Sequence, residues 1–152
     1  MRRPGRAQSG FTLVELMVVV AVIMTIVALA IPSFLTSRMR ANEGTAAANL
    51  TAVRNGCQTF YTQANPHVYP TAMTDLIAPT SNPPYIDPVL AAGQRQGYDF
   101  FYSNPDAEHF TLLARPVVYG RTGNKNYYAD ETGIITATTL DQAAGPSDPQ
   151  VQ

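Results

Sequence analysis

Glu15 is the one charged residue in residues 11–31, a stretch in which 18 of the 21 residues are apolar. A carboxylate held among lipid tails costs a few kcal/mol unless it finds a partner or reaches water. Glu15 lies about one helical turn from the start of the stretch, and this position leaves two interpretations open. The side chain either reaches the lipid–water interface, or it pairs with a cation inside the apolar layer.

The stretch that carries Glu15 has the length of a membrane-spanning helix. At about 1.5 Å per residue it would rise roughly 31 Å, which is close to the hydrocarbon thickness of a bilayer. The small-residue cleavage site of a secretory signal does not follow Ile31, so we expect the helix to be retained. Three arginines precede it, Arg2, Arg3 and Arg6. They favour a cytoplasmic N-terminus, with the rest of the chain across the membrane.

A longer motif surrounds Glu15. Residues 9–16 read SGFTLVEL and resemble the prepilin signature of the type IV pilins and the related pseudopilins. The resemblance implies that a prepilin peptidase removes the basic leader, residues 1–10, by cutting between Gly10 and Phe11. Phe11 is then expected to be N-methylated. The resemblance also implies that Glu15 pairs with the α-amino group of Phe11 in a neighbouring subunit, which fixes the axial register of the helices in a filament.

The same resemblance implies a function and a location. We expect a non-enzymatic structural subunit of a type IV pilus, a helical homo-oligomer that serves adhesion, motility or uptake. Before assembly the chain would span the inner membrane once, surrounded by lipid, with a periplasmic head, and would contact the inner-membrane assembly machinery. It would then become part of an extracellular pilus. Two alternatives stay open: a pseudopilin of a type II secretion system, and a minor pilin that binds DNA or a surface.

Pro32 ends the apolar stretch and predicts a helix kink or local melting, because proline cannot donate a hydrogen bond to the preceding turn. Helical periodicity then resumes over residues 33–64. The apolar positions predict one stripe: Leu35, Met39, Ala46, Leu50, Val53, Cys57, Phe60 and Ala64. We therefore expect one helix over about residues 11–63. Its first part, residues 11–32, spans the membrane or lies in a filament core, and its second part supports the head.

Three segments follow the helix. Residues 65–96 hold six of the twelve prolines and are predicted to connect the helix to a sheet with little regular structure. Residues 97–140 alternate in polarity between short turn signals, which predicts an antiparallel four-stranded meander. Pro116 suggests an edge position or a bulge. Residues 141–152 lack an apolar pattern and are predicted to be a mobile tail. The predicted class is α+β, with the long N-terminal helix packed on the sheet.

Charge and cysteine content exclude several other functions. The net charge is −1, and without the leader 7 basic and 11 acidic residues give −4, which argues against general binding of nucleic acid. Cys57 is the single cysteine and cannot form an intramolecular disulfide. We interpret it as a core residue, with an intermolecular disulfide or a reactive thiol as alternatives.

Other residues with metal-binding or catalytic side chains are few. His67 and His109 lie far apart in the sequence, without a nucleophile at a catalytic spacing, so neither catalysis nor a cofactor is expected. A calcium site needs several oxygen ligands. The acids that could supply them are Asp130, Glu131, Asp141 and Asp148. An exposed hairpin turn around Asp130 and Glu131 is the interpretation we favour over a metal site.

Overall fold

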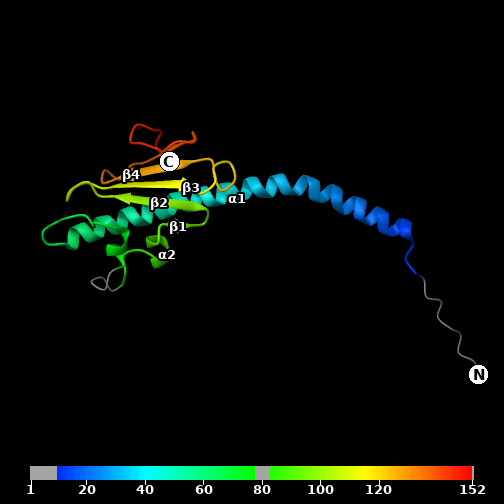
Figure 1. The fold of residues 1–152 in the computed structure, drawn as a ribbon, viewed down its shortest axis with the longest axis horizontal. Coiled ribbons are helices and arrows are strands. Elements are labelled where there is room, and N and C mark those ends of the chain that lie inside the picture. The colour runs from blue at the N-terminus through cyan, green and yellow to red at the C-terminus, as the bar shows by residue number, and fades with distance from the viewer. Residues whose placement is uncertain (1–9, 78–82, 152) are drawn as a thin grey trace, which may run out of the picture. The chain divides into compact units, whose positions relative to one another are not determined.

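The computed structural model describes residues 10–77 and 83–151 (Figure 1). The predicted leader, apart from Gly10, lies outside the described residues, as do residues 78–82 of the Pro-rich connection. The chain divides into two compact units, Met1–Thr36 and Ser37–Gln152, and the second is called the head below. The elements in chain order are α1 (Leu13–Gln63), η1 (Met73–Leu76), α2 (Pro88–Ala91), β1 (Gln94–Arg95), β2 (Tyr98–Ser103), β3 (Thr111–Pro116), β4 (Asn126–Asp130) and β5 (Ile135–Thr138).

The long helix α1 begins two residues after the predicted start and ends at the predicted residue. Pro32 lies inside it, and the helix is continuous through this position, so local melting does not occur there. The hydroxyl of Thr36 donates a 3.0 Å hydrogen bond to the Pro32 carbonyl oxygen. A kink at Pro32 stays a prediction.

The part of α1 within the head buries one face. Ala46, Leu50, Val53 and Cys57 are each at most 2% exposed. These four residues are the centre of the predicted stripe, so the stripe is confirmed here. Leu35 belongs to the first unit and is 48% exposed.

The head sheet is an antiparallel meander of five strands in the order β1 to β5, which confirms the predicted class but corrects the predicted count of four. The additional strand, β1, has two residues within the predicted connection and pairs with Asp99 and Tyr98 of β2. A strand of two residues is too short to show an alternation of polar and apolar residues, so the sequence pattern does not predict it. β3 lies between β2 and β4, so Pro116 is not at a sheet edge; it is the last residue of its strand.

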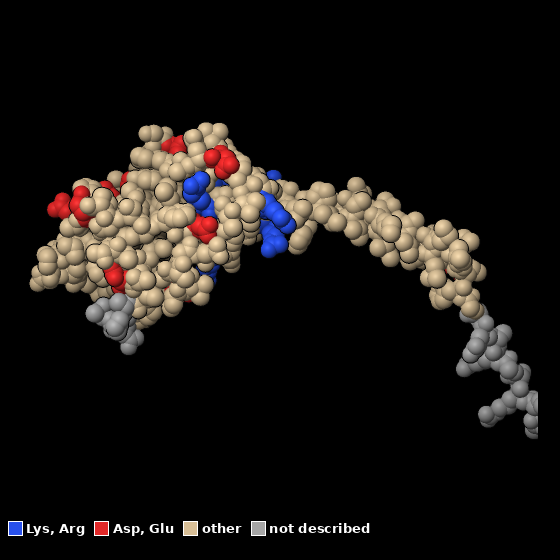
Figure 2. Space-filling view, in the orientation of Figure 1, with Lys and Arg blue, Asp and Glu red and all other residues tan. Residues whose placement is uncertain are grey.

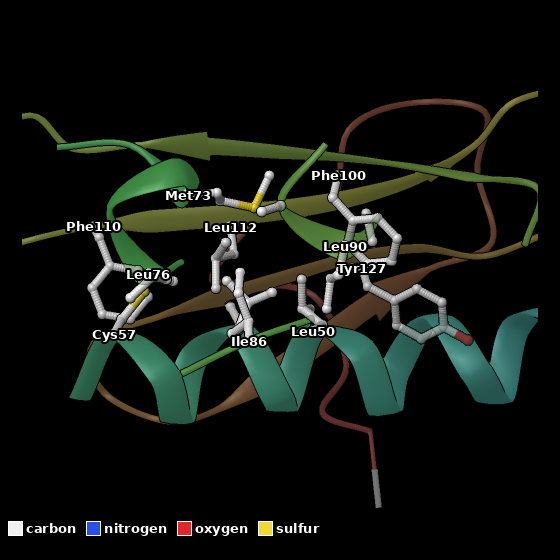
Figure 3. Close-up of a cluster of buried hydrophobic side chains, with 14 of the residues drawn as sticks. Leu50, Cys57, Met73, Leu76, Ile86, Leu90, Phe100, Phe110, Leu112 and Tyr127 are labelled. Atoms are coloured by element: carbon white, nitrogen blue, oxygen red, sulfur yellow. The ribbon is translucent and has the colours of Figure 1, made fainter. Parts of the chain in front are cut away.

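The core lies between the sheet and α1 (Figure 3). Leu50 and Cys57 of α1 face Leu112, Phe110 and the other inward residues of the sheet. The Pro-rich connection adds four buried side chains to the same core, Met73, Leu76, Ile86 and Leu90. The connection therefore supplies part of the core as well as joining the helix to the sheet.

The C-terminal segment runs beside the free edge of β5. The amide of Ala137 donates to the Pro149 carbonyl oxygen, and the amide of Val151 donates to the Ile135 carbonyl oxygen, each at 2.9 Å. Ala144 is 5% exposed. This differs from the expected mobile tail. Backbone hydrogen bonds attach the segment to the sheet, and such bonds leave no trace in the pattern of apolar residues.

Candidate processing and assembly site

Glu15 and Thr12 form a capping box at the start of α1. The backbone amide and the hydroxyl of Thr12 both donate to Oε2 of Glu15, at 2.9 and 2.8 Å. The backbone amide of Glu15 donates in return to the Thr12 hydroxyl oxygen at 3.2 Å. Each side chain thus binds the backbone of the other residue, which satisfies amides that a helix start leaves without partners. The spacing Thr-x-x-Glu is the sequence signal for this box, and the charge-pairing interpretation did not use it.

The capping box leaves half of the Glu15 carboxylate available. Both hydrogen bonds from Thr12 end on Oε2, and no hydrogen bond to Oε1 is found among residues 10–77 and 83–151. An ionised carboxylate offers about four lone-pair positions. Glu15 can therefore cap its own helix and accept a further hydrogen bond from a cation at the same time.

Gly10 and Phe11, the predicted cleavage residues, lie just before the helix. Both are outside regular structure, and Phe11 is 84% exposed. A Cβ atom added at Gly10 would meet nothing within 4 Å. Peptidases cut exposed backbone outside helices and sheets most readily. The peptide bond between these residues has that geometry, while its cleavage stays a prediction.

The first half of α1 presents its apolar side chains on all sides. The large apolar residues from Phe11 to Leu35 are between 45% and 84% exposed. Among the described residues, α1 is the one helix long and apolar enough to cross a membrane. An apolar surface of this extent is not stable in water, so it needs lipid or other protein chains around it.

Cys57 and the histidines lie apart from this segment. Cys57 is fully buried, and loss of solvation raises the pKa of its thiol to about 12, which fits a core residue rather than a reactive thiol. The ring of His67 stacks on Tyr61, and Nδ1 of His109 lies 2.8 Å from Oδ1 of Asp106. The histidines thus make separate local contacts.

Two of the acids considered for calcium, Asp130 and Asp148, accept hydrogen bonds within local turns. Oδ1 of Asp130 accepts a 3.0 Å hydrogen bond from the Thr132 amide, and Oδ2 of Asp148 accepts one of 2.7 Å from the Gly145 amide. β4 ends at Asp130 and β5 begins at Ile135, as the hairpin interpretation predicts. Within the described part of the chain, no three residues of the types His, Cys, Asp and Glu are grouped to hold a metal ion.

Comparisons with known proteins point to the N-terminal segment. Residues 5–31 match a family model described as the prokaryotic N-terminal methylation motif. Over 54 residues the chain is 41% identical to the type IV major pilin protein PilA of Myxococcus xanthus (strain DK1622). This match covers 36% of the chain and 24% of that relative, so the chain spans about a quarter of the relative's length. A comparison with the solved structures found no match.

The long helix, the antiparallel sheet and the N-terminal motif together define a pilin-like protein. The methylation motif and the similarity to PilA support a relation to the type IV pilin family, in agreement with the resemblance of residues 9–16. This family is structural and non-enzymatic.

Proposed function

We propose that the chain is a structural subunit of a type IV pilus. A prepilin peptidase removes residues 1–10, Phe11 is N-methylated, and the mature chain polymerises through the first half of α1 into an extracellular filament. The observation that carries this proposal is the uncovered apolar half of α1, which begins directly after the methylation motif. Its large apolar side chains are exposed in the described part of the chain, which is what a subunit stored in lipid and used in a filament requires.

The two environments of α1 are physically similar. Lipid tails are as apolar as packed leucine and valine side chains, so a helix passes from one to the other with a modest change in free energy. The proposed route therefore begins with the helix in the inner membrane and the N-terminus in the cytoplasm. The assembly machinery then moves the helix into a bundle of identical helices, while the head stays outside.

Glu15 supplies specificity that apolar packing lacks. Packed apolar helices can slide along one another, whereas an ion pair in a low dielectric has one favourable position. After cleavage, Phe11 carries a free α-amino group, and Oε1 of Glu15 in a neighbouring copy is available to it. We propose that this pair fixes the register of the filament.

The test is to shear cells mechanically and to quantify the chain in the released filaments by mass spectrometry. The proposal predicts that this chain is the most abundant protein of the filament fraction. Trace amounts beside another abundant subunit would support a minor pilin. Retention in the envelope, together with a secretion defect on deletion of the gene, would support a pseudopilin.

A further inference from the structure

The end of the head where the β3–β4 loop meets α1 is a defined surface. The side-chain amide of Asn42 donates to the Thr122 carbonyl oxygen at 3.0 Å. Oε1 of Glu43 accepts a 2.8 Å hydrogen bond from the backbone amide of Asn124. These two contacts attach the loop, residues 117–125, to the first turns of the helix within the head. Side chains of the loop and of the helix start therefore lie at the same end of the head.

This end carries cations and exposed apolar side chains together. We call it the basal patch, and it consists of Arg38, Arg40, Val117, Val118, Arg121 and Lys125, all exposed. Val117 and Val118 are 45% and 48% exposed. Three acids lie nearby. Glu43 contacts the loop, Asp141 follows Leu140, and Asp148 lines the same surface hollow as Lys125 and Leu140. Four cations against three acids leave the patch with an excess of one positive charge.

The opposite end of the head carries more acids than cations, although Arg54 lies there and donates to the Gly133 carbonyl oxygen at 2.6 Å. The β2–β3 and β4–β5 turns meet there, because Oε1 of Glu131 lies 3.9 Å from Nε2 of His109. Asp106 and Glu108 belong to the first of these turns, and Asp130 ends β4 just before the second. In Figure 2, Lys and Arg side chains gather at one end of the head, where acidic side chains also lie beside them, and further acidic side chains stand out at the other end. The head therefore has an electrostatic polarity along the sheet.

Chain connectivity keeps the start of the head, including Arg38, near the membrane. Arg38 follows Ile31, the end of the apolar stretch, by seven residues. Seven residues rise about 10 Å as a helix and reach at most about 25 Å when extended. Whatever the orientation of the head, its first residues thus begin within reach of the lipid headgroups on that side of the bilayer.

We propose that the basal patch docks the unassembled head on anionic phospholipid headgroups of the membrane that α1 spans. This rests on the proposed function, because it requires the apolar half of α1 to lie in a bilayer. The cations attract phosphate groups, and the two valines enter the apolar boundary of the headgroup layer. The acidic end is repelled by the same lipids. The docked head presents one fixed orientation to the assembly machinery.

The test uses the full chain in lipid nanodiscs. An Asn124→Cys variant carries a fluorophore beside the patch, and an Ala107→Cys variant carries it in the turn at the opposite end; native Cys57 is buried and stays unlabelled. Quenching by nitroxide headgroups is compared between discs containing phosphatidylglycerol and discs of phosphatidylcholine alone. We expect strong quenching at position 124 only in the anionic discs, and weak quenching at position 107 in both.

Removal of charge from the patch is the matched variant. Arg121→Ser with Lys125→Ser changes two exposed side chains, and unchanged thermal unfolding verifies that the head is folded. We expect the ratio of docked to free heads to fall by about fivefold for each charge removed, and to fall further in high salt. Equal quenching in both kinds of disc, or wild-type quenching in the double variant, would overturn the proposal. If the double variant keeps wild-type quenching in the discs but no longer assembles filaments in cells, the patch would be assigned to contact with a second copy.

Failure of the proposed function gives a separate result. A chain that does not stay in the disc at all has no membrane-spanning half of α1, and both proposals then fail. A chain that stays in the disc without lipid-dependent quenching, and that forms filaments in cells, overturns the docking proposal alone.

Discussion

Glu15 accepts two hydrogen bonds from Thr12, one from the backbone and one from the hydroxyl, and so caps the helix through which the subunit is proposed to polymerise. The acid therefore has a local role in a single chain as well as the proposed role between chains. Both roles depend on the same carboxylate but on different oxygens. They can be separated by substitutions that remove either the cap or the charge.

Glu15→Gln should be processed normally and should assemble poorly. Glutamine can still cap the helix in a capping box, but it has no charge for the α-amino group of Phe11. The measurements are the ratio of precursor to mature chain and the yield of sheared filaments. Wild-type filament yield from this variant would mean that charge pairing does not drive assembly.

Thr12→Ala is the matched control. It removes the hydroxyl from the cap and leaves the charge of Glu15 in place, at a cost of about 1 kcal/mol in stability of the helix start. We expect filament yield to stay well above that of Glu15→Gln. Equal loss in both variants would indicate that the cap, rather than the charge, is what assembly needs.

Gly10→Leu should accumulate as unprocessed precursor in the membrane. A Cβ atom added at this position meets nothing within 4 Å among the described residues, so the substitution should leave the fold unchanged. The block is expected at the peptidase, which must accommodate the residue before the cut. Immunoblotting of membranes measures it, and normal maturation would refute cleavage after Gly10.

Two glycines of α1 in the head should respond oppositely to alanine. At Gly44 a Cβ meets nothing within 4 Å, so Gly44→Ala should stabilise the head by about 1 kcal/mol through helix propensity. At Gly56 a Cβ lies 2.8 Å from Cγ2 of the buried Ile86. Overpacking there costs about 1–3 kcal/mol, which offsets or exceeds the gain in propensity. Thermal unfolding should show a higher Tm for Gly44→Ala and not for Gly56→Ala.

Cys57 should resist alkylation in the folded chain. Its thiol is fully buried and its pKa is raised to about 12, so almost no thiolate is present at pH 8. Iodoacetamide should modify it only after unfolding, whereas the exposed thiol of Asn124→Cys should react at once. Rapid modification of native Cys57, or a disulfide-linked dimer in filaments, would restore the alternatives of a reactive or bridging cysteine.

The contact between His109 and Asp106 should titrate. The hydrogen bond and charge of Asp106 raise the pKa of His109 above 6.5, while hydrogen bonds from the Glu108 amide and from His109 lower the pKa of Asp106 below 3.8. The stabilisation of the folded state by protonated His109 is therefore complete below pH 6.5. It is lost as the pH rises through the pKa of His109 in the folded protein. The stabilisation of the folded state by ionised Asp106 is present above pH 3.8. It is lost as the pH falls through the pKa of Asp106 in the folded protein. NMR titration of Asp106→Asn should show a lower pKa for His109.

The helix and most of the sheet could be predicted because their signals are periodic. Leu50 and Cys57 recur at helical spacing, and Phe100 and Leu112 belong to segments that alternate in polarity. β1 and the pairing of Val151 with β5 could not be predicted in the same way. They depend on backbone hydrogen bonds between short segments, which place no demand on side-chain type.

The candidate site could be predicted in part. Gly10, Phe11 and Glu15 were assigned from the motif, and the structure shows that the first two lie outside the helix and that Glu15 lies in its first turn. The cap formed with Thr12 was not predicted, although its spacing is visible in the sequence. The polarity of the head was also not predicted, because it arises from turns that only the meander brings to the same end.

The most direct test of the account is the intact mass of this chain in sheared filaments. The account predicts a polypeptide that begins at Phe11 and carries one methyl group on its α-amino nitrogen. A filament chain that keeps residues 1–10, or that begins at another residue, would contradict it.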